Sequence, residues 1–99
     1  SEAAGVVVEV GSDVTHIRVG DEVAMAMAGG AMAEEMVVEA SVCFPKPWNF
    51  SFAEAAAYFV GYCTAYHGLV QRGGLKKGET LLVTGAGGGM GSIAVQLGK

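Results

Sequence analysis

The first half of the chain alternates short apolar runs with polar turns, which is the pattern of half-buried β-strands. Residues 4–10 carry valines at alternate positions and are followed by a Gly-Ser-Asp turn. A second turn at residues 19–21 leads into another strand, and residues 34–39 are also predicted to be a strand. Pro45 and Pro47 then disfavour regular structure, because proline lacks a backbone N–H donor. The pattern predicts part of a small β-barrel or sandwich.

A helical pattern replaces the strands after Ser51. Ser51 and Glu54 have the spacing of a capping box, in which each side chain satisfies the other residue's backbone N–H. Alanines follow, and alanine has the highest helix propensity of all residues. We expect the helix to continue to residue 70 with a break near Gly61, and the pair Gly73-Gly74 to end it.

The most informative segment is residues 80–99, where an apolar run is followed by a glycine-rich stretch and a second helical pattern. Residues 80–84 are predicted to be a strand, and residues 85–91, here called the glycine loop, contain five glycines, one alanine and one methionine. Glycine allows a strand to turn directly into a helix, and the helix N-terminus then offers N–H groups to an anion. This layout is typical of the first half of a dinucleotide-binding βαβ unit.

The spacing of the glycine loop leaves an alternative open. The loop reads Gly85-x-x-Gly88-x-x-Gly91 and lacks a strict G-x-G-x-x-G, so a flexible glycine-rich turn without a ligand also fits the loop alone. A phosphate-binding P-loop does not fit, because Gly98-Lys99 would require glycine where Ile93 stands.

Composition narrows the function classes. Hydrophobic residues make up 52% of the chain and charged residues 16%, which favours a packed chain over a disordered one. The net charge of −4 argues against nucleic-acid binding, and no apolar run is long enough to span a membrane. Cys43 and Cys63 lack the spacing of a structural zinc site and are expected to be free thiols in a reducing, cytoplasmic compartment.

Three segments resemble the medium-chain dehydrogenase/reductase superfamily, and within it the zinc-independent NADPH:quinone oxidoreductase branch. They are residues 4–23, residues 55–69 and residues 73–99, in the order and spacing of that family. The resemblance implies a β + α/β fold. Residues 1–50 would be the C-terminal part of a GroES-like β domain, and residues 51–99 the inter-domain helices with the first strand, glycine loop and first helix of a Rossmann domain. Because members are several times longer, the chain is expected to be an internal fragment.

The same resemblance implies a cofactor site for NADPH, with NADH not excluded. Gly85, Gly88, Gly89, Met90 and Gly91 would bind the pyrophosphate through their backbone, and Thr64 would lie beside the nicotinamide. The alternative for Thr64 is a helix hydroxyl bonded to a preceding carbonyl group. The residue that distinguishes NADP from NAD would lie about 20 positions beyond the loop.

The resemblance also implies that no metal takes part. Zinc enzymes of the superfamily have a histidine at the position of Ser1 and a cysteine at the position of Val60, and neither Ser nor Val is a zinc ligand. The acceptor carbonyl would then be polarised by hydrogen bonds, which suits quinones and α,β-unsaturated carbonyls. No catalytic residue can be assigned within the chain.

Other residues have plainer interpretations. His16 is expected at the surface and His67 in structural packing. Tyr58, Tyr62 and Tyr66 are expected to share one helix face that packs against the cleft or the Rossmann sheet, and a place for Tyr62 beside the nicotinamide pocket is the alternative. Alternative functions are an enoyl-thioester reductase of the same superfamily, a non-catalytic NADPH-binding protein and a GroES-like interaction module. The full-length protein is expected to be a homodimer, and residues 1–99 alone to be inactive.

Overall fold

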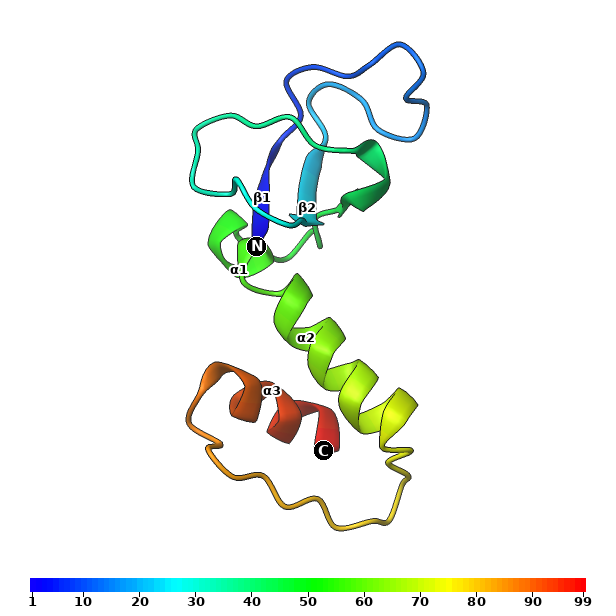
Figure 1. Cartoon of the computed structure of the whole chain (residues 1–99), viewed down its shortest axis with the longest axis vertical. Coiled ribbons are helices and arrows are strands. Elements are labelled where there is room, and N and C mark those ends of the chain that lie inside the picture. The colour runs from blue at the N-terminus through cyan, green and yellow to red at the C-terminus, as the bar shows by residue number, and fades with distance from the viewer. The chain divides into compact units, whose positions relative to one another are not determined.

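The computed structural model describes residues 1–99, and its internal contacts divide the chain into two units. The first unit is Ser1–Phe59 and the second is Val60–Lys99. Figure 1 shows strands and short helices in the first unit, one of them the 3-10 helix η1 (Ala40–Val42), and helices joined by a long loop in the second.

The first unit is built on a three-stranded antiparallel sheet. Its strands are β1 (Glu2–Val6), β2 (Glu22–Ala26) and β3 (Cys43–Pro45), and β2 lies in the centre. Glu2 pairs with Ala26, and Met25 pairs with Cys43. β3 is an edge strand and ends at Pro45, and proline is tolerated on an edge strand where its missing N–H would face away from the sheet.

The strand predicted for residues 4–10 is present but displaced. β1 begins at Glu2 and ends at Val6, and the chain then leaves the ladder although Val7 still exchanges backbone hydrogen bonds with the turn before β2. That turn has the predicted position, with Gly20 at a φ of +94°, a left-handed conformation that favours glycine.

The strand predicted for residues 34–39 is wrong. Bends occupy residues 32–35, and the following residues have no partner strand. The alternation itself is real, since Met36 and Val38 pack against the core while Val37 is fully exposed. An apolar alternation thus marks which side chains are buried, but a strand also requires a neighbouring backbone with which to pair.

The sheet buries side chains on both faces. On one face Val23 and Met25 form a core with Ile17, to which partly buried valines and methionines add. Ala24 points to the opposite face, because successive side chains of a strand alternate, and it is 1% exposed. Helix α1 (Phe52–Ala56) contacts β1 and β2 and buries Ala55 completely. Burial raises the pKa of the Cys43 thiol at the edge of this core.

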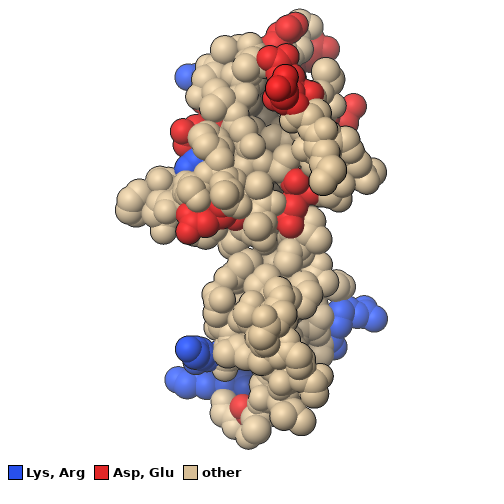
Figure 2. Space-filling view, turned by 90° about the vertical axis from the view of Figure 1, so that its left-hand side faces the viewer, with Lys and Arg blue, Asp and Glu red and all other residues tan.

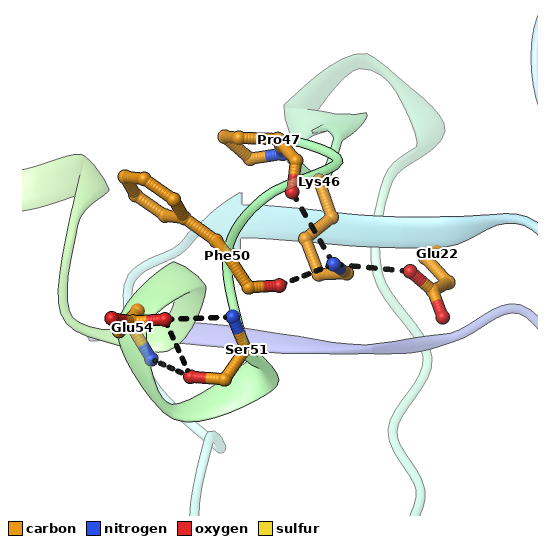
Figure 3. A network of polar contacts seen from close by, with 6 residues as sticks. All are labelled: Glu22, Lys46, Pro47, Phe50, Ser51 and Glu54. Carbon is orange, nitrogen blue, oxygen red and sulfur yellow. Dashed lines mark hydrogen bonds and ion pairs between the residues drawn. The ribbon is translucent and has the colours of Figure 1, made fainter.

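The capping box at the start of α1 is confirmed. The Glu54 backbone N–H donates to the Ser51 hydroxyl at 3.2 Å, and the Ser51 N–H donates to the Glu54 carboxylate at 2.8 Å (Figure 3). The backbone N–H of Ser51, more than its hydroxyl, stabilises the ionised carboxylate and lowers the pKa of Glu54.

We therefore expect Ser51→Ala to reduce the free energy of unfolding, by an amount typical of a lost N-cap, about 1 kcal/mol. The pKa of Glu54 is lower in the folded state than in the unfolded state. The ionised carboxylate therefore stabilises the fold at pH values above the unfolded-state pKa, and this stabilisation is lost as the pH falls through the folded-state pKa. Urea titrations at neutral and acidic pH measure both effects. Glu54→Gln should abolish only the loss of stability at acidic pH that comes from protonation of Glu54. An unchanged pH dependence of stability in that variant would contradict the role of the carboxylate.

Lys46 ties the end of β3 to the turn before α1. Its ammonium group, on a side chain only 6% exposed, lies 3.1 Å from the Glu22 carboxylate and donates to the carbonyl oxygens of Pro47 and Phe50 at 3.3 and 2.5 Å (Figure 3). The ring of Phe52 lies 5.4 Å from the same nitrogen. A buried charge is tolerated only when it is paired and hydrogen-bonded, and Lys46 satisfies this condition.

The second unit contains most of helix α2 (Phe59–Tyr66), a π-helix η2 (His67–Arg72) and helix α3 (Gly89–Gly98). The predicted break near Gly61 is wrong: the helical path is interrupted earlier, at residues 57–58. The Gly73-Gly74 stop is confirmed, with Gly74 at a φ of +65°.

The break before α2 also changes the interpretation of the tyrosines. Tyr58 lies in the turn before α2, with its ring 5.3 Å from Phe50 and 6.4 Å from Phe59. Only Tyr62 and Tyr66 therefore share a helix, and the predicted face of three tyrosines is wrong.

Residues 80–84 are not assigned as a strand, in contrast to the prediction. The segment has no partner strand among residues 1–99, and Leu82 is 86% exposed. β structure is defined by interstrand hydrogen bonds, so an apolar run of the right composition does not form a strand without a neighbour.

Charge is distributed unevenly between the two units. Nine of the ten carboxylate side chains belong to the first unit, and four of the six basic side chains belong to the second. Figure 2 shows red side chains over the first unit and blue ones mainly over the second. The second unit therefore carries a net positive charge although the chain as a whole is acidic. None of the helices combines the length and apolar character that crossing a membrane requires.

Candidate functional site

The glycine loop makes a tight turn that leads directly into α3. Gly85 has a φ of +68°, and its carbonyl oxygen accepts a hydrogen bond from the Gly88 N–H at 3.0 Å. Gly88 is the N-cap of α3, and the first intrahelical bond of the helix runs from the Ser92 N–H to the Gly88 carbonyl at 2.8 Å. The N–H groups of Gly89, Met90 and Gly91 therefore have no partner within the helix.

Gly91 is required by the packing of the loop on itself. A Cβ at this position would overlap the carbonyl oxygen of Gly85 and would lie 2.7 Å from the Cα of Ala86. The loop backbone thus passes directly over the first turn of α3, which only a residue without a side chain permits.

Gly87 and Gly89 have a different environment, because a Cβ at either position would meet no atom within 4 Å. The fold itself does not require glycine at these two positions. An external group that approaches the backbone would require it, since a side chain would hold that group away from the N–H groups. This combination of open space, unpaired helix N–H groups and positive helix dipole fits a phosphate.

A pocket of about 310 Å³ lies beside the loop within the second unit. Thr64 from α2 lines it together with Met90 and Gly91 from the first turn of α3, so the structure brings these three predicted residues together. Gly85, Gly88 and Gly89 build the turn but do not line this pocket. Thr64 therefore contributes a hydroxyl group to this pocket.

The rest of the pocket wall was not predicted from the sequence. The remaining lining residues are small or apolar apart from one threonine, namely Ala65, Gly68, Leu69, Val83, Thr84 and Ala94. The only signal in the sequence is that most of them lie close to predicted residues. Val83 and Thr84 end the apolar run before the loop, and Gly68 lies one helical turn after Thr64. The pocket therefore offers an apolar wall with two hydroxyl groups, which suits a flat heteroaromatic ring better than a charged ligand.

α2 and α3 pack closely beside this pocket. A Cβ on Gly61 would lie 2.7 Å from the Cδ1 of Ile93, a side chain that is 9% exposed. The hydroxyl of Tyr62 donates a hydrogen bond of 2.5 Å to the Oε1 of Gln96. Tyr62 is not among the residues that line the pocket.

The structure offers no donor set for a metal ion, since it contains no group of three or more His, Cys, Asp or Glu side chains placed to bind one. His16 Nε2 lies 3.1 Å from the carbonyl oxygen of Ala40, and His67 Nδ1 lies 2.6 Å from the Oε1 of Gln71. Each histidine thus has a local partner from its own unit.

Comparison with known proteins places this geometry in a family. Residues 1–48 match the model of the alcohol dehydrogenase GroES-like domain. A quinone oxidoreductase-like protein 2 homolog of Nematostella vectensis is 44% identical over 98 residues, which are 98% of this chain and 27% of that protein. A 2-methylene-furan-3-one reductase of Solanum lycopersicum is 44% identical over 107 residues, an alignment that covers 99% of this chain and 27% of that protein. The spectinabilin polyketide synthase system protein NorB of Streptomyces orinoci is 44% identical over 98 residues, an alignment that covers 99% of this chain and 4% of that protein.

Solved structures agree with these relatives. The CurK enoyl reductase superimposes with a TM-score of 0.90 at 33% identity, over 97% of this chain and 29% of that one. A mycobacterial protein, Rv1454c, complexed with NADPH superimposes with a TM-score of 0.87 at 37% identity, over 97% and 30%. The chain thus spans about a quarter of the two reductase-like relatives and under a third of these structures.

The chain combines a GroES-like β unit with a glycine-rich loop that leads into a helix. The chain belongs to the medium-chain dehydrogenase/reductase superfamily.

Proposed function

We propose that the chain is part of an NADPH-dependent reductase that transfers hydride to quinones or other α,β-unsaturated carbonyl compounds without zinc. The observation that carries this proposal is the pocket shared by Thr64 and the first turn of α3, directly beside a helix N-terminus with open glycine positions. Relatives named as a quinone oxidoreductase-like protein and a furanone reductase, and a related structure with NADPH, support the same reaction class.

The residues fit a dinucleotide in a definite orientation. The N–H groups of Gly89 and Met90 would hold the pyrophosphate, since nothing fills the space in front of Gly89. The apolar pocket wall would hold the nicotinamide, and the Thr64 hydroxyl is available to its carboxamide. The cofactor supplies the hydride, and the protein supplies orientation and exclusion of water. NADH remains an alternative donor.

The proposed mechanism contains no zinc because the side chains at the expected ligand positions cannot bind it. Ser1 and Val60 stand where zinc enzymes of the superfamily have ligands, and neither side chain binds Zn²⁺. Without a Lewis acid, hydrogen bonds must stabilise the negative charge that develops on the acceptor oxygen. A delocalised enolate or hydroquinone anion requires the least such help, which favours conjugated acceptors.

The test uses the complete protein that contains these residues. After exhaustive chelation it should oxidise NADPH with a quinone acceptor at an undiminished rate. Loss of activity on chelation and its recovery with added zinc would overturn the proposal.

An enoyl-thioester reductase is the second candidate, and similarity to the CurK enoyl reductase favours it. Its acceptor is also a conjugated carbonyl, so the cofactor site would be unchanged. Comparing kcat/KM for a simple quinone and for an enoyl thioester distinguishes the two. A protein that binds NADPH yet reduces neither acceptor would instead be a non-catalytic NADPH-binding member.

We expect Thr64→Val to weaken NADPH binding by about threefold to tenfold, the range for one lost hydrogen bond between a protein and its ligand. Valine keeps the shape of threonine and removes only the hydroxyl that Thr64 contributes to the pocket. Thr84→Val provides a second hydroxyl deletion in the same pocket for comparison. Fluorescence titration with NADPH measures the affinity, and unchanged affinity in Thr64→Val would exclude it from the site.

Residues 1–99 alone should bind NADPH weakly or not at all. The segment at residues 80–84 lacks neighbouring strands, and Leu82 is 86% exposed, so the sheet that supports a dinucleotide site is incomplete. Calorimetry on this segment that gave micromolar affinity would contradict the expectation.

We further propose that the complete protein is a cytoplasmic homodimer. Both cysteines are free and Cys63 is exposed, a state that a reducing compartment maintains. Sedimentation of the purified protein tests the dimer, and fractionation of cells tests the location.

A further inference from the structure

A short hydrogen bond joins the two helices that carry the pocket. The hydroxyl of Tyr62 on α2 donates to the Oε1 of Gln96 on α3 at 2.5 Å, across 34 positions of the chain. Neither residue lines the pocket or belongs to the glycine loop. The bond therefore acts on the proposed site only through the placement of the helices.

The surrounding packing does not determine that placement by itself. Gly61 lies against Ile93, and the small Ala65 on α2 is 6% exposed. The contact of Gly61 with the Ile93 side chain is apolar, and apolar contacts are non-directional. A hydrogen bond weakens steeply when its angle is distorted, so the Tyr62–Gln96 bond fixes the register that the apolar contacts leave free.

This register determines the geometry of the pocket. Thr64 follows Tyr62 by two positions on α2, and Met90 precedes Gln96 by six positions on α3, about 9 Å along the helix axis. A rotation of α3 about the contact at Gly61 would move its N-terminus relative to Thr64. Both sides of the pocket are thus held by helices that this bond joins.

We propose that Tyr62 and Gln96 are positioning residues: their hydrogen bond sets the orientation of the α3 N-terminus toward Thr64 and thereby the affinity for the nicotinamide nucleotide. This inference rests on the proposed function, because it assigns a role in the same cofactor site.

The test is a double-mutant cycle in the complete protein. Tyr62→Phe and Gln96→Met keep the size of each side chain and remove the bond. Each should raise the Kd and the KM for NADPH by about threefold to tenfold, with little change in kcat or in the KM for the acceptor. The double variant should be no worse than either single variant, since all three lack the same bond.

Tyr66→Phe is the matched control. Tyr66 lies one turn further along α2, is 48% exposed and does not line the pocket, so loss of its hydroxyl should leave the affinity for NADPH unchanged. The fluorescence of bound NADPH gives a further readout, because a displaced nicotinamide changes its emission, whereas a loss of stability alone does not.

The outcomes separate this inference from the proposed function. A wild-type protein that binds no NADPH would overturn both. A wild-type protein that binds NADPH, with variants that lose stability but keep the affinity and emission of wild type, would overturn the positioning role alone. Additive effects of the two substitutions would also overturn it, because they would show that the side chains do not act through a shared bond.

Discussion

Gly91→Ala is expected to lower the free energy of unfolding of the complete protein by about 1–3 kcal/mol, the usual cost of forcing an extra group into a packed site. The added methyl group would overlap the carbonyl oxygen of Gly85, a backbone atom that cannot rotate away as a side chain can. The loop must therefore open. Opening would move the N–H groups at the start of α3 away from the proposed position of the NADPH pyrophosphate, so the affinity for NADPH should fall as well. Urea unfolding and NADPH titration measure the two effects.

Gly87→Ala is the control for Gly91→Ala. It adds the same methyl group to the same loop, but at a position with open space and without a positive φ. Its free energy of unfolding should remain close to that of wild type. Equal destabilisation by the two substitutions would show that general loss of glycine in the loop, and not the close approach at Gly91, is responsible.

Lys46→Met is expected to cost about 1.5–3 kcal/mol of stability, the range for hydrogen bonds that involve a charged group. Methionine preserves the apolar stem of the side chain and removes the ammonium. The carbonyl oxygen of Phe50 then loses its 2.5 Å donor, and the Glu22 carboxylate loses its ion pair. Thermal or urea unfolding measures the loss.

Glu22→Gln distinguishes the two parts of the Lys46 network. The Glu22 side chain is half exposed, and exposed ion pairs contribute little, so this variant should lose much less stability than Lys46→Met. Comparable losses would mean that the ion pair outweighs the carbonyl hydrogen bonds, which would contradict the expectation.

Local signals in the sequence predicted local structure well. Ser51 and Glu54 form the capping box that their spacing indicates, because both partners lie within one helical turn. Gly20 and Gly74 mark a turn and a helix end, since both need only their own backbone to adopt a positive φ. α3 begins at Gly89, within the glycine loop, after the turn that the positive φ of Gly85 allows.

Predictions that depended on distant partners were wrong. Residues 34–39 and residues 80–84 have strand composition, but neither finds a strand with which to pair. The helix break lies at residues 57–58, where the ring of Tyr58 contacts Phe50 and Phe59, and the sequence pattern did not indicate these contacts. The hydrogen bond of Tyr62 to Gln96 spans 34 positions and was likewise not predictable from spacing.

The candidate site shows the same division. The glycine loop was predicted from its composition, and its role as a turn follows from φ and close packing at Gly85 and Gly91. That Thr64 shares a pocket with Met90 depended on the resemblance to a family, since the two residues lie on different helices. The apolar remainder of the wall emerged only from the packing of the second unit.

The central claim is that the backbone at the start of α3 holds the pyrophosphate of NADPH, and calorimetric titration of NADPH into the complete protein with Gly89→Ala tests it most directly. No atom lies within 4 Å of a Cβ at this position, so the fold should tolerate the methyl group fully. The predicted result is unchanged or slightly higher stability, with a Kd for NADPH raised by about tenfold, or 1.4 kcal/mol. An unchanged Kd would contradict the claim, because a pyrophosphate bound against this backbone could not avoid the added methyl group.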